Sequence, residues 1–249
     1  MQYGICNLSI VPLRQEPNDQ SELTSQVLFG EHFKVLEMRK HWSRIRLAFD
    51  RYEGWIDNKQ FVLIEEALYK HLDKTPARLS ADLVEFVYNK TNDLLPIPLG
   101  STISTAEHLD SHYDGAVKTG EQPKEEILKT AFMYLNSPFL WGGKTPFGID
   151  SSGFTQMVYK LNGYKLLREP GQQATQGEAL SFIEESEPGD LAFFDNDEGE
   201  IIHVGIIMEN NYIIHAYGQV RIDRIDHSGI FNADKNMHTH KLRVIKKII

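Results

Sequence analysis

The sequence predicts an α+β protein with two small β domains and one larger domain, and three observations support this fold class. A chain of 249 residues exceeds the usual length of a single domain. Short β-type runs broken by turn residues fill its first half. From residue 121 onward two helical patterns come first and apolar strands follow, which is the order typical of an α+β domain.

The composition is that of a globular protein and argues against a nucleic-acid partner. Hydrophobic residues make up 41% of the chain and charged residues 24%, both close to globular averages. The formal net charge is −9, from 26 Lys and Arg against 35 Asp and Glu, and no basic run is longer than Lys246-Lys247. The positive surface that nucleic-acid binding requires is therefore not expected.

The N-terminus and the cysteine count bear on the compartment. Cys6 is the single cysteine, so no internal disulfide can form. The first 20 residues lack the basic region and the apolar stretch of a signal peptide, and no segment approaches the roughly 18 apolar residues of a membrane span. We expect a cytoplasmic monomer without membrane contact. An exported protein whose signal peptide has been removed is the alternative.

The first half of the chain predicts two small β domains, at residues 1–65 and 66–120. In the first, runs such as NLSIVPLR, HWSRIRLAF and YEGWI alternate with turn residues, as in a small barrel. The second repeats the pattern with LVEFVYN and LLPIPLG after a helical EEALYKHL. Polarity rises around residues 119–122, which favours a domain boundary near 120.

The last domain, residues 121–249, predicts N-terminal helices and then an antiparallel sheet. PKEEILKTAFMYLN places its apolar residues on one helical face, and a second helix is expected from about Ser152 to Asn162, with Gly163 as its stop. The strands that follow are expected in these segments: DLAFFDN, HVGIIME, YIIHAYG, QVRIDRI and KLRVIKKI.

A polar junction and two strand histidines are the candidate chemistry of this domain. Asp150, Ser151 and Ser152 lie at a loop-to-helix junction, where unpaired backbone N–H groups and the helix dipole favour a nucleophile. A simple helix cap explains the same residues. His203 and His215 lie in apolar strands, where each needs a partner for its ring nitrogens. Together the residues match the nucleophile, base and orienting group of acyl transfer.

Five short blocks follow one another in this domain: WGG at 141–143, DSSG at 150–153, PGD at 188–190, HVG at 203–205 and HA at 215–216. In this order they resemble the NlpC/p60 cell-wall peptidases, which are papain-like cysteine hydrolases, and the resemblance covers about 125 residues. The two β domains resemble the bacterial SH3-like barrels that precede the catalytic domain in one branch of the family. That branch cleaves γ-D-glutamyl–diamino acid bonds in murein peptides.

The resemblance implies roles for three residues of the catalytic machinery. Ser151 falls at the nucleophile position, His203 matches the general base, and His215 matches the third residue, which orients the base. No cofactor and no metal ion is implied. The implied substrate is a murein tripeptide or tetrapeptide, L-Ala-γ-D-Glu-diamino acid, and the diamino acid stays open between diaminopimelate and lysine.

The resemblance also implies a set of substrate-binding residues. Asp150 resembles the acidic residue that holds the free α-amine of the N-terminal L-alanine, and Ser152 helps line the same pocket. Tyr52 and Glu31 resemble residues of the first β domain that close the pocket over this amine, and Trp141 resembles a cleft wall. Packing inside the barrel explains the Tyr52 segment, YEGW, equally well.

Ser151 is the one departure from the family pattern, because the family has a cysteine there. A cysteine at a helix N-terminus beside a histidine forms a standing thiolate, whereas a serine hydroxyl stays protonated. We therefore expect little or no activity. Three origins remain open: an introduced Cys-to-Ser substitution, a natural pseudoenzyme or a natural serine variant. The intact state of every other matched block favours the first.

Three further functions compete with the peptidase. The strongest is a catalytically silent module that binds cell-wall peptide. A metal hydrolase would use His108 and His112 or the pair His238 and His240, yet neither pair has companion ligands at a usual spacing, and exposed loop histidines explain both. Acyl transfer to lipid lacks a membrane-surface segment to support it.

The hairpin between the two histidines poses a problem of register. A two-residue turn at Asn210-Asn211 would pair Glu209 with Tyr212 and place His203 and His215 on opposite faces of the sheet. A catalytic arrangement therefore requires a bulge or a turn with an odd number of residues.

Overall fold

The computed structural model describes all residues, Met1–Ile249, and divides into two compact units. Unit 1 comprises Met1–Glu121 and Trp141–Pro146, and unit 2 comprises Gln122–Leu140 and Phe147–Ile249. Each helix falls short of the length and hydropathy needed to cross a bilayer.

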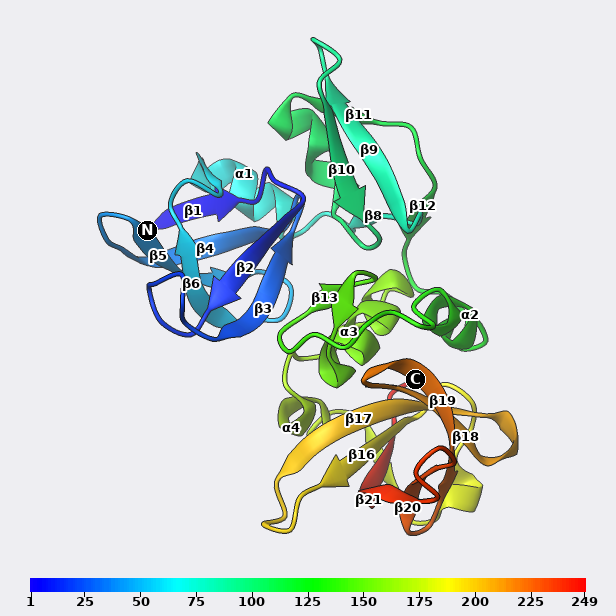
Figure 1. Ribbon diagram of the computed structural model, residues 1–249. Coiled ribbons are helices and arrows are strands. Elements are labelled where there is room, and N and C mark those ends of the chain that lie inside the picture. The colour runs from blue at the N-terminus through cyan, green and yellow to red at the C-terminus, as the bar shows by residue number, and fades with distance from the viewer. The chain divides into compact units, whose positions relative to one another are not determined.

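Unit 1 begins with a seven-stranded antiparallel sheet that coils around one core (Figure 1). In the strand Trp42–Leu47 every second side chain is buried, so those of Ser43, Ile45 and Leu47 point inward. The strand order is β3-β2-β6-β5-β4-β1-β7. The bounds are β1 Gln2–Ile5, β2 Ile10–Arg14, β3 Leu23–Leu28, β4 His32–Met38, β5 Trp42–Leu47, β6 Glu53–Asp57 and β7 Val62–Ile64.

The rest of unit 1 has a smaller core, which it shares with the first sheet. Phe29, which follows β3, packs in one cluster with Val87, Ile97 and Ile103. The three-stranded sheet β10-β9-β11 and the 3-10 helix η1 contribute residues to this cluster, and a two-stranded sheet, β12-β8, contacts η1. The bounds are α1 Glu66–Leu72, β8 Arg78–Ser80, β9 Val84–Asn89, β10 Leu94–Pro98, the 3-10 helix η1 Ile103–Leu109, β11 Ser111–Tyr113 and β12 Val117–Thr119. The division into SH3-like domains at 1–65 and 66–120 stays a prediction.

The segment Trp141–Pro146 packs with unit 1, although it follows a helix of unit 2 in the chain. It contains β13, Lys144–Thr145. The indole Nε1 of Trp141 donates to Glu22 at 2.6 Å, and the backbone N–H of Lys144 donates to Gln26 at 2.7 Å. Gly142 has a φ of +76° and lies against the Leu23 carbonyl, where a Cβ would clash. The glycine-rich loop therefore packs against the first sheet and is held there by hydrogen bonds.

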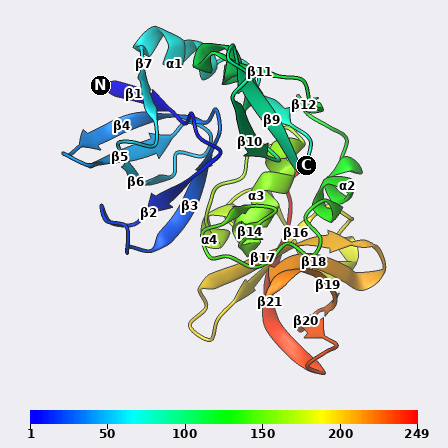
Figure 2. The same ribbon diagram turned by 45° about the horizontal axis from the view of Figure 1, so that its top comes forward.

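Helices and a barrel make up the two layers of unit 2. Helix α3, Ser151–Leu161, packs against β17 and β18 (Figures 1 and 2), and all of its residues are buried. The predicted stop is confirmed, since Gly163 follows the helix with a φ of +88°. The other short elements are α2 Glu126–Phe132, β14 Gly148–Ile149, α4 Pro170–Gln173, β15 Glu178–Leu180 and the 3-10 helix η2 Ile183–Glu185.

The antiparallel sheet of unit 2 closes into a six-stranded barrel. Its order is β15-β21-β16-β17-β18-β19-β20, and β21 also pairs with β20, which closes the ring. Each strand segment expected from the sequence is confirmed. The bounds are β16 Leu191–Asp195, β17 Ile201–Met208, β18 Tyr212–Tyr217, β19 Gln219–Asp226, β20 Gly229–Asn232 and β21 Met237–Lys247.

The turn between β17 and β18 has three residues, Glu209–Asn211, and so resolves the problem of register. Asn210 and Asn211 both have positive φ, which asparagine tolerates better than most residues. Met208 pairs with Tyr212 and Gly205 with His215, one residue away from the pairing of a two-residue turn. Because Gly205 and His203 are two residues apart, His203 and His215 lie on the same face of the sheet.

Candidate active site

Asp150 caps the helix that carries Ser151. It has extended backbone angles, and its carboxylate accepts the Gly153 N–H at 2.6 Å, so the helix-cap prediction is confirmed. Ser151 is the first residue of α3 and only 5% exposed. Ser151 thus belongs to the first helical turn, whose backbone N–H groups lack carbonyl partners within the helix and can stabilise a developing negative charge.

Arg168, which the sequence analysis missed, holds Asp150 in a buried ion pair. Its guanidinium donates to both carboxylate oxygens, at 2.6 Å and 3.0 Å, and to the Ser152 hydroxyl at 3.0 Å. The side chain of Arg168 is 1% exposed. A fork of this kind fixes both the position and the orientation of a carboxylate. Arg168 lies in a loop without a periodic pattern, so no signal in the sequence pointed to it.

His203, His215 and Asp223 form a hydrogen-bonded chain inside the barrel. His203 Nε2 lies 2.8 Å from His215 Nδ1, and His215 Nε2 lies 3.1 Å from Asp223 Oδ2. Nδ1 of His203 is the ring nitrogen left for a nucleophile. Asp223 was missed, although the alternation in QVRIDRI gave a signal, since a carboxylate there shares the inward face with the buried Ile225.

The environment keeps both histidines in their neutral form. Burial and then the neighbouring His215 and His240 hold the pKa of His203 well below its usual value. Burial also lowers the pKa of His215, although Asp223 opposes this effect. Burial alone would raise the pKa of Asp223, but its hydrogen bonds with His215 and Arg221 outweigh burial and the pKa is lowered. A neutral His203 beside an oriented His215 can accept a proton.

His240 is a third histidine of this cluster, and the expectation that it lies in an exposed loop is wrong. It belongs to β21 and is half-buried, because closure of the barrel brings β21 beside β20 and β16. Its ring stacks on that of His203, with centroids 4.1 Å apart and planes at 27°. His238, two residues earlier in β21, is exposed as expected but does not lie in a loop, and its Nε2 is 3.0 Å from Asp226 Oδ2.

The other candidate histidines and the cysteine take no part in this cluster. His108 and His112 are exposed as expected, but they lie in η1 and β11 rather than in a loop. Cys6 is fully buried in the core of the first sheet, and burial raises the pKa of its thiol to about 12. A thiol of this kind stays protonated and does not replace the missing cysteine.

Tyr52, Glu31 and Trp141 belong to unit 1, and their place in a substrate pocket stays a prediction. Tyr52 is half-buried against the core of the first sheet, and Trp141 is 59% exposed. Glu31 is 5% exposed and accepts the Leu28 N–H at 2.9 Å. The Nζ of Lys144, also buried, lies 3.4 Å and 3.5 Å from its two carboxylate oxygens.

Comparison with protein families and known sequences finds two matching family models and several similar proteins. The model of the NlpC/P60 family matches residues 136–239, and that of the bacterial dipeptidyl-peptidase SH3 domain matches residues 13–61. The chain is 28% identical over 217 residues to γ-D-glutamyl-L-lysine dipeptidyl-peptidase of Bacillus subtilis, covering 78% of this chain and 72% of the relative. It is 26% identical to dipeptidyl-peptidase 6 of Lysinibacillus sphaericus, covering 86% and 88%.

A solved structure shares the whole fold. The crystal structure of an NlpC/P60 family protein from Bacillus cereus superposes with a TM-score of 0.78 and covers 99% of both chains at 18% identity. At this identity the likeness concerns the fold alone.

Proposed function

This chain carries an NlpC/P60 domain that follows a bacterial dipeptidyl-peptidase SH3 domain, and from this premise we propose that it is a cell-wall peptide hydrolase scaffold. Its proposed substrates are murein tripeptides and tetrapeptides with a free N-terminal L-Ala, cleaved at the γ-D-Glu–diamino acid bond. Relatives named γ-D-glutamyl-L-lysine dipeptidyl-peptidase support this substrate class.

The observation that carries the proposal is the hydrogen-bonded chain of His203, His215 and Asp223. In this mechanism Nδ1 of His203 takes the proton of the nucleophile at position 151. Nδ1 of His215 holds the His203 ring through a hydrogen bond with Nε2 of His203. Asp223 fixes the tautomer of His215 through a hydrogen bond with Nε2 of His215. The N-terminus of α3 stabilises the negative charge that develops during attack.

Ser151 limits what this arrangement can do. A thiol at position 151 would ionise in the field of the helix N-terminus, whereas a hydroxyl must lose its proton during attack itself. The oxyanion site of a cysteine hydrolase also suits the longer C–S bond. We therefore propose that the chain with Ser151 is inactive or very slow, and that an introduced Cys-to-Ser substitution best explains this residue.

A silent peptide-binding module is the second candidate, and Ser151 itself favours it. In this alternative the buried pair of Asp150 and Arg168 still shapes a pocket, and the peptide binds without turnover. Peptide binding without any hydrolysis by the Ser151→Cys variant would support this alternative.

Mass spectrometry of peptide cleavage tests the proposal. L-Ala-γ-D-Glu-diaminopimelate and its lysine counterpart are each incubated with the chain and with the Ser151→Cys variant. We expect release of L-Ala-γ-D-Glu by the variant and little by the chain. Two inactive proteins would contradict the proposed enzyme, and fast hydrolysis by the chain with Ser151 would make it a serine hydrolase.

A second measurement separates the roles of the two histidines. In the Ser151→Cys background, His203→Ala should abolish turnover, because it removes the ring nitrogen that takes the proton of the nucleophile. His215→Ala should lower kcat less steeply, since this residue orients the base. Near-normal turnover by the His203→Ala variant would contradict the role of His203 as the general base.

A further inference from the structure

The barrel of unit 2 gathers three imidazoles that the proposed reaction does not all require. His203, His215 and His240 come from β17, β18 and β21, and one ring nitrogen of each lies within 4.8 Å of the other two. The reaction uses the first two residues only. Closure of the barrel through β20 and β21 adds the third, so the cluster follows from the fold rather than from one local motif.

We propose that His203, His215 and His240 bind one divalent transition-metal ion of the zinc class. In a tetrahedral site with Zn–N bonds of about 2.0–2.1 Å, the ligand nitrogens lie about 3.3 Å apart. Here His203 Nε2 and His215 Nδ1 are 2.8 Å apart, and no pair in the cluster exceeds 4.8 Å. Ring rotations that move the ligand nitrogens by an ångström or two would therefore suffice to point all three at one ion.

The surroundings of the cluster supply the outer contacts that such a site needs. Asp223 lies 3.1 Å from His215 Nε2, which leaves Nδ1 of His215 for the metal ion. The hydroxyl of Thr239 lies 2.9 Å from His240 Nδ1, which leaves Nε2 of His240. Carboxylate or hydroxyl partners of this kind fix the tautomer and the direction of metal-binding histidines. Three neutral imidazoles suit zinc, copper and nickel rather than magnesium or calcium.

Metal binding and peptide hydrolysis would exclude each other, a consequence that rests on the proposed function. With a metal ion on Nε2 of His203, the proton of the neutral ring lies on Nδ1. This nitrogen then donates instead of accepting, so His203 loses the lone pair that takes the proton of the nucleophile. The ion therefore acts as a reversible inhibitor, and three protein ligands leave a fourth position for water.

Calorimetric titration of the chain with Ser151 tests the site without any activity assay. The probes are zinc chloride and magnesium chloride, and the protein is first treated with a chelator. We expect the titration to give one zinc ion per chain and no binding of magnesium. In thermal unfolding, saturating zinc should raise the Tm by at least about 3 °C, and magnesium should leave it unchanged. The His240→Gln variant should raise the Kd for zinc at least about tenfold, because it removes one of three ligands.

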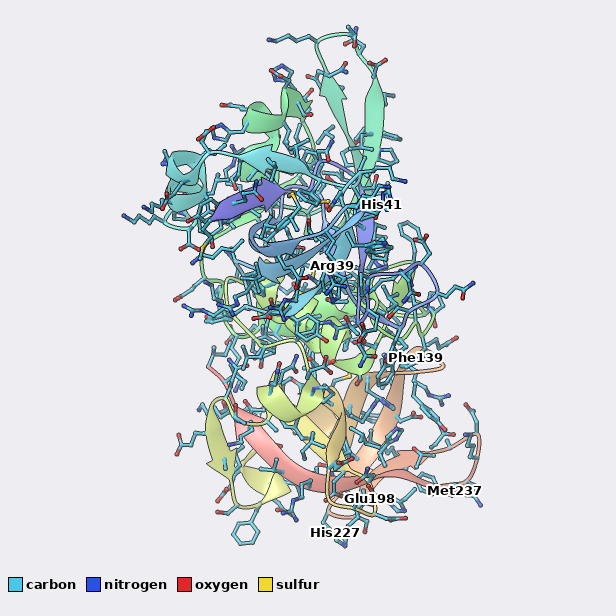
Figure 3. All side chains as sticks on the ribbon, turned by 90° about the vertical axis from the view of Figure 1, so that its left-hand side faces the viewer. Arg39, His41, Phe139, Glu198, His227 and Met237 are labelled. Carbon is cyan, nitrogen blue, oxygen red and sulfur yellow. The ribbon has the colours of Figure 1, made fainter.

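Two exposed histidines provide matched controls. His238 lies two residues away on the same strand, and His227 is exposed in the turn between β19 and β20 (Figure 3). His238→Gln and His227→Gln should leave zinc affinity unchanged. Circular dichroism of the metal-free proteins checks that each variant is folded. The proposal is overturned if His240→Gln leaves the Kd unchanged or if either control weakens binding as much.

Failure of the metal site and failure of the proposed function give different results. Zinc binding through His240 together with an inactive Ser151→Cys variant would keep the site and remove the enzyme. A Ser151→Cys variant that cleaves murein peptide, with no His240-dependent zinc binding by the chain, would keep the enzyme and remove the site. Binding is measured on the serine form because a thiolate at position 151 is itself a zinc ligand.

Discussion

Asp150 and Glu31, the two carboxylates of the predicted amine pocket, are each buried beside a cation, one in each unit. Asp150 meets the fork of Arg168 at 2.6 Å and 3.0 Å, whereas Glu31 lies 3.4 Å and 3.5 Å from the single ammonium of Lys144. Asp150 also caps a helix, and Glu31 also accepts one backbone N–H. The two sites thus share a design but differ in how tightly the carboxylate is held.

The difference follows from the chemistry of the two cations. A guanidinium matches both oxygens of a carboxylate at once, whereas an ammonium is a point charge on a flexible stem. Asp150 is therefore fixed in place, and most of its charge is already compensated. A substrate ammonium at Asp150 would meet a neutralised pair, so orientation and hydrogen bonding would contribute more to its recognition than net charge.

The largest effect is expected from breaking the tighter pair. Arg168→Met leaves Asp150 buried without its guanidinium and should lower the free energy of unfolding by about 3–5 kcal/mol. Urea unfolding measures this change. Adding Asp150→Asn should recover a large part of the loss, since asparagine keeps the cap and removes the buried charge. A loss below about 1 kcal/mol for Arg168→Met would contradict the comparison.

The looser pair should cost less to break. Lys144→Met should lower the free energy of unfolding by about 1–3 kcal/mol, because Glu31 keeps the hydrogen bond from the Leu28 N–H and its ion pair with Lys144 is longer. The same urea experiment applies, with Glu31→Gln and the double variant completing a mutant cycle. If Lys144→Met lowers the free energy of unfolding more than Arg168→Met does, the geometry of the ion pair does not explain the difference between the two sites.

Asp150 and Glu31 can also be compared by their effects on substrate selectivity. In the Ser151→Cys background, acetylation of the substrate amine should lower kcat/KM at least about tenfold, since a charge-assisted hydrogen bond contributes about 1.5–3 kcal/mol. Asp150→Asn should erase most of this preference, and kinetics on free and acetylated peptides measure it. Glu31→Gln tests the second carboxylate in the same assay. Equal rates on both peptides would remove the amine pocket.

The histidine cluster differs from the two buried ion pairs, because the fold keeps its side chains neutral. Burial, followed by the neighbouring His215, lowers the pKa of His240 to about 4 although Asp223 opposes this effect, and the usual value of an unfolded chain is 6.5. Between pH 6.5 and 4 the unfolded chain therefore binds a proton that the folded chain does not. This contribution to stability is complete above pH 6.5 and declines as the pH falls towards 4.

A pH series of urea unfolding with chelator present measures this contribution. His240→Gln should flatten the decline between pH 6.5 and 4 by up to about 1.4 kcal/mol per pH unit, the value for one proton. His203 and His215 keep part of the slope in this variant, because burial lowers their pKa values in the same direction. His227→Gln, at an exposed position, should leave the slope unchanged. Identical slopes for the chain and the His240→Gln variant would contradict the burial of His240.

Local patterns in the sequence determined the elements and the first residues of the site. The apolar face of Ser151–Leu161, the cap at Asp150 and the apolar runs of five strands depend on residues that are close together in the sequence. Such local signals can be read from the sequence alone. The ordered blocks around Ser151, His203 and His215 also identified the family that the comparisons support. Chain order alone carries this kind of information.

Only the tertiary structure decided which residues meet across the barrel and in the buried pairs. The partners of His215 and Asp150 are 8 and 18 residues away, and His240 joins the cluster only because β21 closes the barrel. The three-residue turn at Glu209–Asn211 decided that His203 and His215 share a face. Such contacts depend on register and closure, and a shift of one residue reverses the face of every side chain in a strand.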